Sequence, residues 1–171
     1  MKAAQYDKPN KKVVINHVPI PEPGDGQVLV KVTAASLCHS DLMMELRPDD
    51  FGRPMTMGHE GVGVVHKLHP TAEGKGLQVG DKVGALYIND CCFTCESCQA
   101  HGTQCEQPKR GGAKVMGLMG DGFFAEYALV DWENCIVLPA ELPIERMSPL
   151  FCAGITGTSL LLTTRCRLGR G

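Results

Sequence analysis

Long apolar runs are missing from this sequence of 171 residues. Its longest aliphatic stretches, such as Leu160 to Leu162, are far shorter than the ~20 residues that a membrane-spanning helix needs. The N-terminal segment MKAAQYDKPNKK also lacks the apolar stretch of a secretory signal. These absences predict a chain that neither crosses a membrane nor carries an export signal.

An excess of charge of one sign is missing as well. The chain has 17 Lys and Arg against 19 Asp and Glu, so its net charge is -2. A nearly neutral chain of this kind predicts neither nucleic acid nor an acidic membrane surface as a partner. Hydrophobic residues make up 43%, which is enough for one domain with its own core.

Cysteine, by contrast, is abundant, with nine residues in the chain. In a secreted protein, nine cysteines would indicate disulfides with one cysteine left over. Without an export signal we expect the cytoplasm, where clustered cysteines indicate metal ligands. Cys91, Cys135 and Cys166 lie outside the metal sets described below and are expected to be inert thiols.

Short β-rich runs separated by turn residues fill most of the chain. The segment Pro19 to Gly24 cannot join a strand ladder, and Gly80-Asp81 marks a turn. Many short strands joined by such turns indicate a mainly β domain of the barrel or sandwich type. The expected strands are Ala3–Tyr6, Val13–Val18, Val28–Ala34, Gly61–Leu68, Lys82–Tyr87 and Phe123–Val130.

The segment after Pro143 has a different pattern. Apolar residues recur at helical spacing between Ile144 and Phe151, and Ser148-Pro149 can begin a helix. We therefore expect one or two short helices between Glu145 and Leu162.

Four cysteines gather in the segment Cys92-Phe-Thr-Cys95-Glu-Ser-Cys98 and at Cys105. Zinc takes four thiolates about 2.3 Å away at tetrahedral corners, and two-residue spacers let successive sulfurs reach one ion. A lobe with so little apolar material would draw its folding energy from the metal. A redox Cys-x-x-Cys pair or chance clustering is the alternative, but three linked spacings favour a structural zinc site.

Three further potential ligands stand in separate segments. Cys38 follows the expected strand Val28–Ala34, His59 precedes the expected strand Gly61–Leu68, and Cys152 lies in the expected helical segment. Taken singly, a cysteine or histidine in such a place is more often a packed core residue than a ligand.

Taken together, the segments resemble the zinc-dependent medium-chain alcohol dehydrogenases, especially those of the yeast and fungal type. The shared motifs stand in family order over essentially the whole chain. They are Cys38-His39-Ser40-Asp41, Gly58-His59-Glu60-Gly61-Val62-Gly63, Gly80-Asp81-Lys82-Val83, the lobe with Cys92, Cys95, Cys98 and Cys105, and Cys152-Ala153-Gly154-Ile155-Thr156. The resemblance implies a GroES-like β-barrel over residues 1–145, with the zinc lobe at about 91–110 and a helical linker over 146–171.

The resemblance further implies two zinc ions, one structural and one catalytic. The lobe would hold the first, and Cys38, His59 and Cys152 would hold the second. Three protein ligands leave one position open, as a catalytic zinc requires. Glu60 resembles a residue that can transiently bind this zinc, and Asp41 resembles the carboxylate that orients the zinc-binding histidine.

Other positions resemble residues that handle protons, cofactor and substrate. Ser40 resembles the hydroxyl that receives the alcohol proton. Met43 stands where the family relay often continues through a histidine, so the relay would end at Ser40 or use water. His39 and Thr156 resemble contacts to NAD or NADP, and Tyr87 an aromatic residue of the substrate pocket.

The implied activity is the interconversion of small alcohols and aldehydes or ketones by hydride transfer to NAD or NADP. The family binds this cofactor on a Rossmann domain with a Gly-x-Gly-x-x-Gly turn, which is absent from this chain. We therefore expect an N-terminal fragment that is inactive alone and belongs to a homo-oligomeric enzyme. The alternatives are a non-catalytic zinc-binding module, which needs only the lobe, and a zinc-free quinone reductase relative, which both ligand sets disfavour.

Overall fold

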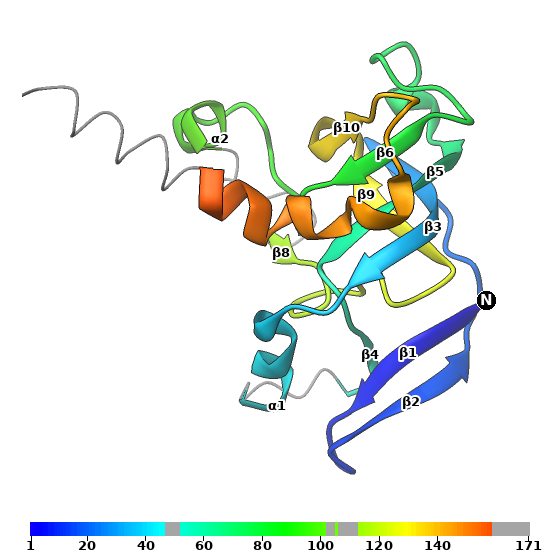
Figure 1. Cartoon of the computed structure of the whole chain (residues 1–171), viewed down its shortest axis with the longest axis vertical. Helices are drawn as coiled ribbons and strands as arrows, with labels where there is room; N and C mark the ends of the chain where they lie inside the picture. Colours follow the sequence, from blue (N-terminus) through cyan, green and yellow to red (C-terminus); the bar gives the residue numbers. More distant parts are fainter. Residues whose placement is uncertain (47–51, 102–104, 106–112, 159–171) are drawn as a thin grey trace, which may run out of the picture.

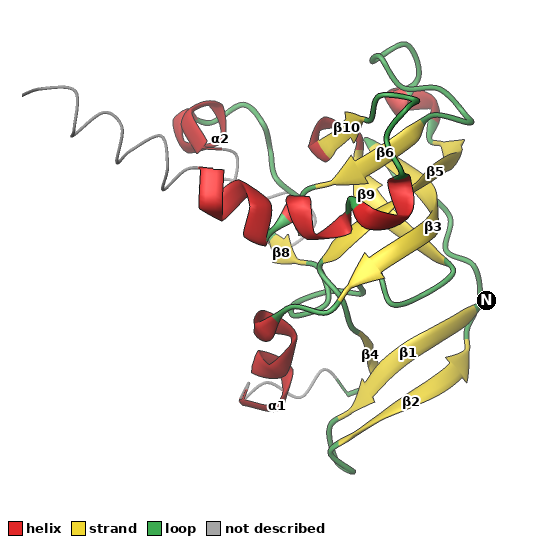
Figure 2. Cartoon of the chain, viewed as in Figure 1, coloured by secondary structure: helices red, strands yellow, loops and turns green. Residues whose placement is uncertain are grey.

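The fold comes from a computed structural model that describes residues 1–46, 52–101, 105 and 113–158. Strands dominate these residues, as the sequence predicts (Figures 1 and 2). The strands are β1 (Lys2–Asp7), β2 (Lys12–His17), β3 (Gln27–Ser36), β4 (Met55–Thr56), β5 (Glu60–Leu68), β6 (Lys82–Ala85), β7 (Ile88–Asn89), β8 (Lys114–Val115), β9 (Tyr127–Asp131) and β10 (Cys135–Val137).

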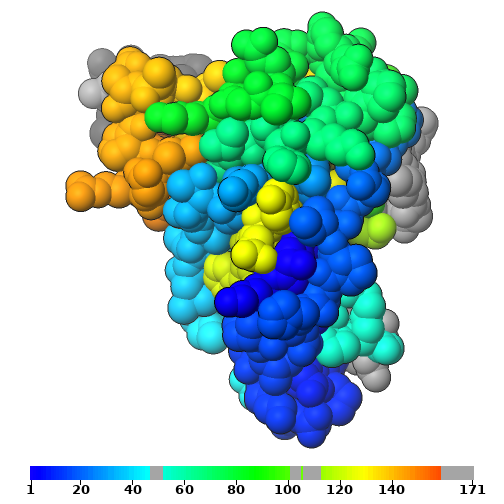
Figure 3. Space-filling model, turned by 90° about the vertical axis from the view of Figure 1, so that its right-hand side faces the viewer, coloured from blue at the N-terminus to red at the C-terminus, as the bar shows by residue number. Residues whose placement is uncertain are grey.

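These strands form three sheets. The largest has five strands in the order β10-β6-β5-β3-β9, and the second has three in the order β2-β1-β4. β7 and β8 pair as a two-stranded ribbon. In the space-filling view the β1–β2 hairpin, in blue, forms one end of the molecule, and the green residues, which include β6, lie at the other (Figure 3).

The helices of the described chain are short. Residues 153–158 are helical and follow two 3-10 turns, which confirms the helical character predicted after Glu145. Residues 159–162 of that predicted segment lie outside the described residues. None of the described helices is long and apolar enough to span a membrane. The helical elements are η1 (His39–Leu42), α1 (Met43–Leu46), η2 (Pro70–Ala72), α2 (Glu96–His101), η3 (Trp132–Asn134), η4 (Ile144–Arg146) and η5 (Ser148–Phe151).

The centre of the larger sheet is the antiparallel pair of β3 and β5. Valines on these strands and on β6 form the core, and Val28, Val65 and Val83 are at most 1% exposed. Burying such β-branched side chains stabilises a sheet by roughly 1.5–3 kcal/mol each. The pairing runs as far as Ser36 opposite Glu60, so the end of β3 meets the start of β5. This register places the chain after β3 beside the chain before β5.

Two of the predicted strands are longer than the observed ones. The strand predicted over Phe123–Val130 begins only at Tyr127. The amides of Phe123 and Phe124 instead donate to the carbonyls of Gly58 and Met57, at 2.9 and 2.8 Å. The strand predicted over Lys82–Tyr87 ends at Ala85, because the Leu86 amide donates to the Asn134 carbonyl of η3, at 3.0 Å, rather than to a neighbouring strand.

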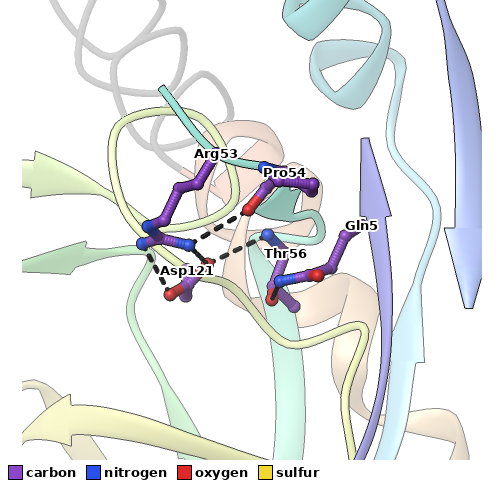
Figure 4. Close-up of polar contacts among 5 residues, drawn as sticks. All are labelled: Gln5, Arg53, Pro54, Thr56 and Asp121. Carbon is purple, nitrogen blue, oxygen red and sulfur yellow. Dashed lines mark hydrogen bonds and ion pairs between the residues drawn. The ribbon is translucent and has the colours of Figure 1, made fainter. Parts of the chain in front are cut away.

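Hydrogen bonds among Gln5, Arg53, Thr56 and Asp121, together called the clamp, fix the loop that leads into β4 and then to His59 (Figure 4). The Asp121 carboxylate accepts two hydrogen bonds from the Arg53 guanidinium, at 3.1 and 2.9 Å. One of its oxygens also accepts the Thr56 amide at 2.9 Å, and the Thr56 hydroxyl accepts the Gln5 side-chain amide at 3.1 Å. The clamp therefore joins β1, β4 and the loop around residue 121.

Candidate metal centres

The structure brings together the four cysteines of the lobe. The sulfurs of Cys92, Cys95, Cys98 and Cys105 lie within 4.8 Å of one another, and those of Cys92 and Cys98 are 3.9 Å apart. Four thiolates around a tetrahedral zinc at 2.3 Å would be separated by about 3.8 Å. The donor set and its spacing therefore fit zinc.

The local backbone explains how the lobe closes. Phe93 has a φ of 57°, in the left-handed region that a bulky residue rarely adopts. This reversal lets the Cys95 amide donate to the Cys92 sulfur at 3.4 Å, while the Cys92 amide donates to the Cys105 sulfur at 3.3 Å. Such a strained conformation persists only where the surrounding structure imposes it, and here the surrounding structure is the set of converging sulfurs.

The pKa values of the lobe thiols differ strongly. Hydrogen bonds from the Thr94 backbone and side chain, then from the Cys95 backbone, lower the pKa of Cys92 to about 5. Burial, together with its hydrogen bond to Cys95, raises the pKa of Cys98 to about 12. A metal ion bound by all four sulfurs would have to displace the remaining protons, which makes its binding pH-dependent.

A second set of potential ligands converges at the meeting point of β3 and β5. Ligand atoms of Cys38, His59, Glu60 and Cys152 all lie within 4.8 Å of one another. Cys38 immediately precedes η1, His59 immediately precedes β5, and Glu60 is the first residue of β5. The pairing of β3 with β5 therefore supplies three of the four donors.

The fourth donor is positioned by the packing of η5. Phe151 is 4% exposed and packs with Val62 and Ile144. It occupies the space above Gly84, where a Cβ atom would lie only 1.8 Å from the Phe151 ring. Cys152 follows Phe151 directly, so this packing brings its sulfur to the end of the sheet.

His59 offers one nitrogen to this second set. Its Nδ1 lies 2.9 Å from the Asp41 carboxylate, and the two side chains are 2% and 0% exposed. Because a carboxylate only accepts hydrogen bonds, Nδ1 carries the proton. Nε2 is buried and has no hydrogen-bond partner among the described residues. A buried nitrogen of this kind is costly unless it is bound, and zinc would satisfy it.

The acidity of these side chains reflects their packing. The hydrogen bond to Asp41 raises the pKa of His59 against the opposing effect of burial. Burial alone would raise the pKa of Cys38, but hydrogen bonds with the Ser40 backbone and side chain lower it overall. Burial and the neighbouring Cys38 thiol raise the pKa of Cys152 to about 12.

Asp41 also holds the Cys38 loop in place. Its second oxygen accepts the Cys38 amide at 2.9 Å, which caps η1. One fully buried carboxylate therefore fixes both the histidine ring and the backbone of the first cysteine.

The other predicted site residues surround this set at different depths. Ser40 is half-buried, and its Oγ lies 4.0 Å from the Cys38 sulfur. The Tyr87 ring meets the His59 ring edge-on, with centroids 6.2 Å apart. His39 and Thr156 are exposed, and the Thr156 hydroxyl donates to the Cys152 carbonyl at 3.0 Å.

The cysteines outside both sets also have defined surroundings. Cys91 is fully buried at the base of the lobe, and burial raises its pKa to about 11. Burial raises the pKa of Cys135 to about 12, and its thiol donates to the Asp131 carbonyl at 3.7 Å. Both are protonated near neutral pH, as expected for inert thiols. Cys166 lies outside the described residues.

Two features of the site were not found from the sequence. The Ser36 hydroxyl donates to one oxygen of Glu60, a contact that depends on strand register. Gly122 lies against the backbone that leads to His59, where a Cβ atom would be 1.9 Å from the Gly58 carbonyl oxygen. The sequence shows the glycines of residues 117–122, but it does not show which backbone segments lie against them in the fold.

Gly122→Ala is therefore expected to destabilise the fold by about 2–3 kcal/mol and to loosen metal binding beside His59. The atoms nearest to the added methyl group are backbone atoms of Gly58 and Gly117, which cannot rotate away. Urea unfolding and metal titration would measure the two effects. Gly120→Ala is the matched control in the same loop, because its Cβ would meet only Lys114 side-chain atoms at 3.5 Å or more. Equal stability of the two variants would contradict this prediction.

Fold and site together define the class of protein. The chain belongs to the family of alcohol dehydrogenase GroES-like domains, whose match covers residues 24–140. This agrees with the mainly β fold and with the GroES-like domain that the motifs implied.

The chain is similar to individual dehydrogenases as well. It is 38% identical to an alcohol dehydrogenase of Rhizobium meliloti (strain 1021) over 99% of this chain and 48% of that protein. The structure matches the alcohol dehydrogenase of the hyperthermophilic archaeon Aeropyrum pernix with a TM-score of 0.77 at 32% identity, over 91% of this chain and 46% of that one. It also matches a short chain alcohol dehydrogenase of Escherichia coli CFT073, complexed with NADH. The TM-score is 0.73 at 28% identity, over 88% of this chain and 42% of that one. The chain spans about half the length of the curated relatives it matches.

Proposed function

We propose that this chain is the catalytic portion of a zinc-dependent alcohol dehydrogenase that interconverts alcohols and aldehydes or ketones with NAD or NADP. One observation carries the proposal above the others. The buried Nε2 of His59 lacks a hydrogen-bond partner among the described residues, and a ring nitrogen of His59 lies within 4.8 Å of the Cys38 and Cys152 sulfurs. Two thiols and one imidazole are the donors of a catalytic zinc site that keeps one position open.

Zinc bound by Cys38, His59 and Cys152 would supply a Lewis acid for the substrate oxygen. Asp41 holds the proton on Nδ1 of His59, so that Nε2 keeps the free lone pair that a metal needs. The half-buried Ser40 hydroxyl beside Cys38 would accept the alcohol proton and release it towards solvent. Glu60 is 2% exposed and places a carboxylate within reach of the same position.

The remaining residues would bind the two reactants. Tyr87 stands edge-on to His59 and would form a wall of a pocket for a small alcohol. His39 and Thr156 are exposed beside Cys38 and Cys152, where a nicotinamide cofactor could contact them. The NADH complex of a structural neighbour supports this cofactor class.

The lobe would hold the second zinc ion in a structural role. Four thiolates leave no position open for a substrate, and so they serve stability rather than chemistry. We further propose a catalytic domain over residues 1–145, a helical linker over 146–171, a homo-oligomeric complete enzyme and a cytoplasmic location. A purely structural zinc-binding module would need only the lobe, and the convergence of Cys38, His59 and Cys152 favours the dehydrogenase.

Metal analysis of the purified 171-residue chain should approach two zinc ions per chain. Cys38→Ser should lower this value to about one, because the second set loses a thiolate while the lobe keeps all four. Elemental analysis after exhaustive dialysis against buffer gives both numbers. Ser97→Ala is a control substitution within α2 that removes no predicted ligand. One zinc ion per chain in the unmodified protein, unchanged by Cys38→Ser, would refute the catalytic site.

A further inference from the structure

Ser36 and Glu60 face each other across the end of the β3–β5 pair. They are register partners, and the Ser36 hydroxyl donates to Oε2 of Glu60. Ser36 is the last residue of β3 and is half-buried, whereas Glu60 is 2% exposed. The hydrogen bond therefore lies at the inner edge of the second ligand set.

Glu60 is also close to the three predicted ligands. One of its carboxylate oxygens lies within 4.8 Å of the ligand atoms of Cys38, His59 and Cys152. A buried carboxylate is expensive to leave without hydrogen-bond donors, and its orientation follows the donors it finds. With one oxygen held by Ser36, the carboxylate is restrained from rotating about its last bond.

The backbone pairing of the two strands fixes the positions of Ser36 and Glu60 relative to each other. Both residues belong to strands of the central sheet, and the neighbouring pair Ala35–Gly61 continues the same ladder. Cys38 is two positions after Ser36 in the sequence. The same segment of chain therefore positions both the Cys38 thiol and the Ser36 hydroxyl. The arrangement couples the placement of a ligand with the placement of the carboxylate next to it.

We propose that Ser36 is a positioning residue that holds the Glu60 carboxylate towards the metal of the second site. This inference rests on the proposed catalytic metal site and adds to it the residue that controls its carboxylate. Residues that orient a metal-binding group commonly change metal affinity by 10–100-fold when they are removed. Ser36→Ala should therefore weaken metal binding at this site by roughly tenfold, with the lobe unaffected.

Cobalt(II) is the probe, because its absorption bands report the number and kind of its ligands. The 171-residue chain is loaded with cobalt, and the spectrum of the Cys38→Ser variant, which keeps only the lobe, is subtracted. Cobalt release to a chelator then gives the dissociation rate of the second site. We expect Ser36→Ala to change the difference spectrum and to speed release by roughly tenfold. Ser36→Thr keeps the hydroxyl on a residue that favours strands and should restore both.

A double-mutant cycle separates positioning from a general effect on the fold. In a Glu60→Ala background, Ser36→Ala should have no further effect on the spectrum or on the release rate, because the group it holds is gone. An equal effect with and without Glu60 would overturn the proposal and make Ser36 a structural residue only. An unchanged spectrum and release rate in Ser36→Ala would also overturn it while leaving the metal site intact. A chain that takes up one cobalt ion, in the lobe alone, would overturn both the site and the role of Ser36.

Discussion

Cys105→Ser is expected to remove the metal from the four-cysteine lobe and to open the lobe to proteolysis. The lobe packs few apolar side chains, so its folding free energy would come from the ion. Structural zinc contributes about 10–16 kcal/mol in small zinc-folded peptides, and a serine in place of one thiolate forfeits much of it. Zinc content should fall by about one ion per chain, and limited proteolysis should cut within the lobe at least about tenfold faster.

Cys135→Ser is the matched control for this experiment. The Cys135 thiol donates to the Asp131 carbonyl at 3.7 Å, and a serine hydroxyl can donate to the same oxygen. Its effect on stability should stay below about 1 kcal/mol, and its zinc content should not change. Equal protease sensitivity of the Cys105 and Cys135 variants would argue against a metal in the lobe.

The two candidate metal sets differ in how far the sequence alone could identify them. The lobe is local, so the spacers between Cys92, Cys95 and Cys98 already limit which sulfurs can meet. Cys38, His59 and Cys152 meet only through the β3–β5 pairing and the packing of Phe151 on Gly84. No periodicity in the sequence encodes those contacts, and the resemblance to a family supplied the grouping instead.

The missed features share a physical cause. β7 and β8 are two residues long, too short for an alternating pattern to appear. The bond from Ser36 to Glu60 depends on register, because shifting one strand by one residue would turn its side chain to the opposite face of the sheet from its partner. Gly122 is required by a backbone that approaches from a distant loop. Each depends on a contact between distant segments rather than on local propensity.

The 171-residue chain by itself is expected not to oxidise alcohols at a measurable rate. Its site can hold a metal and orient a histidine, but hydride transfer also needs the nicotinamide held against the substrate carbon. Such positioning contributes roughly 7–11 kcal/mol, or at least about five orders of magnitude in rate. His39 and Thr156 are exposed single contacts, and the sequence contains no Gly-x-Gly-x-x-Gly turn to seat the pyrophosphate. The zinc-loaded chain should give no ethanol-dependent reduction of NAD or NADP above the buffer.

A chimera provides the positive control for the expected lack of activity in the 171-residue chain. The chain would be fused to the portion of the Rhizobium meliloti relative that it does not match, which makes up about half of that protein. If the site is the catalytic one, the chimera should gain alcohol-dependent NAD or NADP reduction, and Cys38→Ser should abolish it, because the metal then lacks a ligand for its Lewis-acid role. Cys135→Ser in the same chimera should keep the activity. Turnover by the 171-residue chain alone, retained through purification and lost with Cys38→Ser, would show that cofactor positioning does not require a second domain.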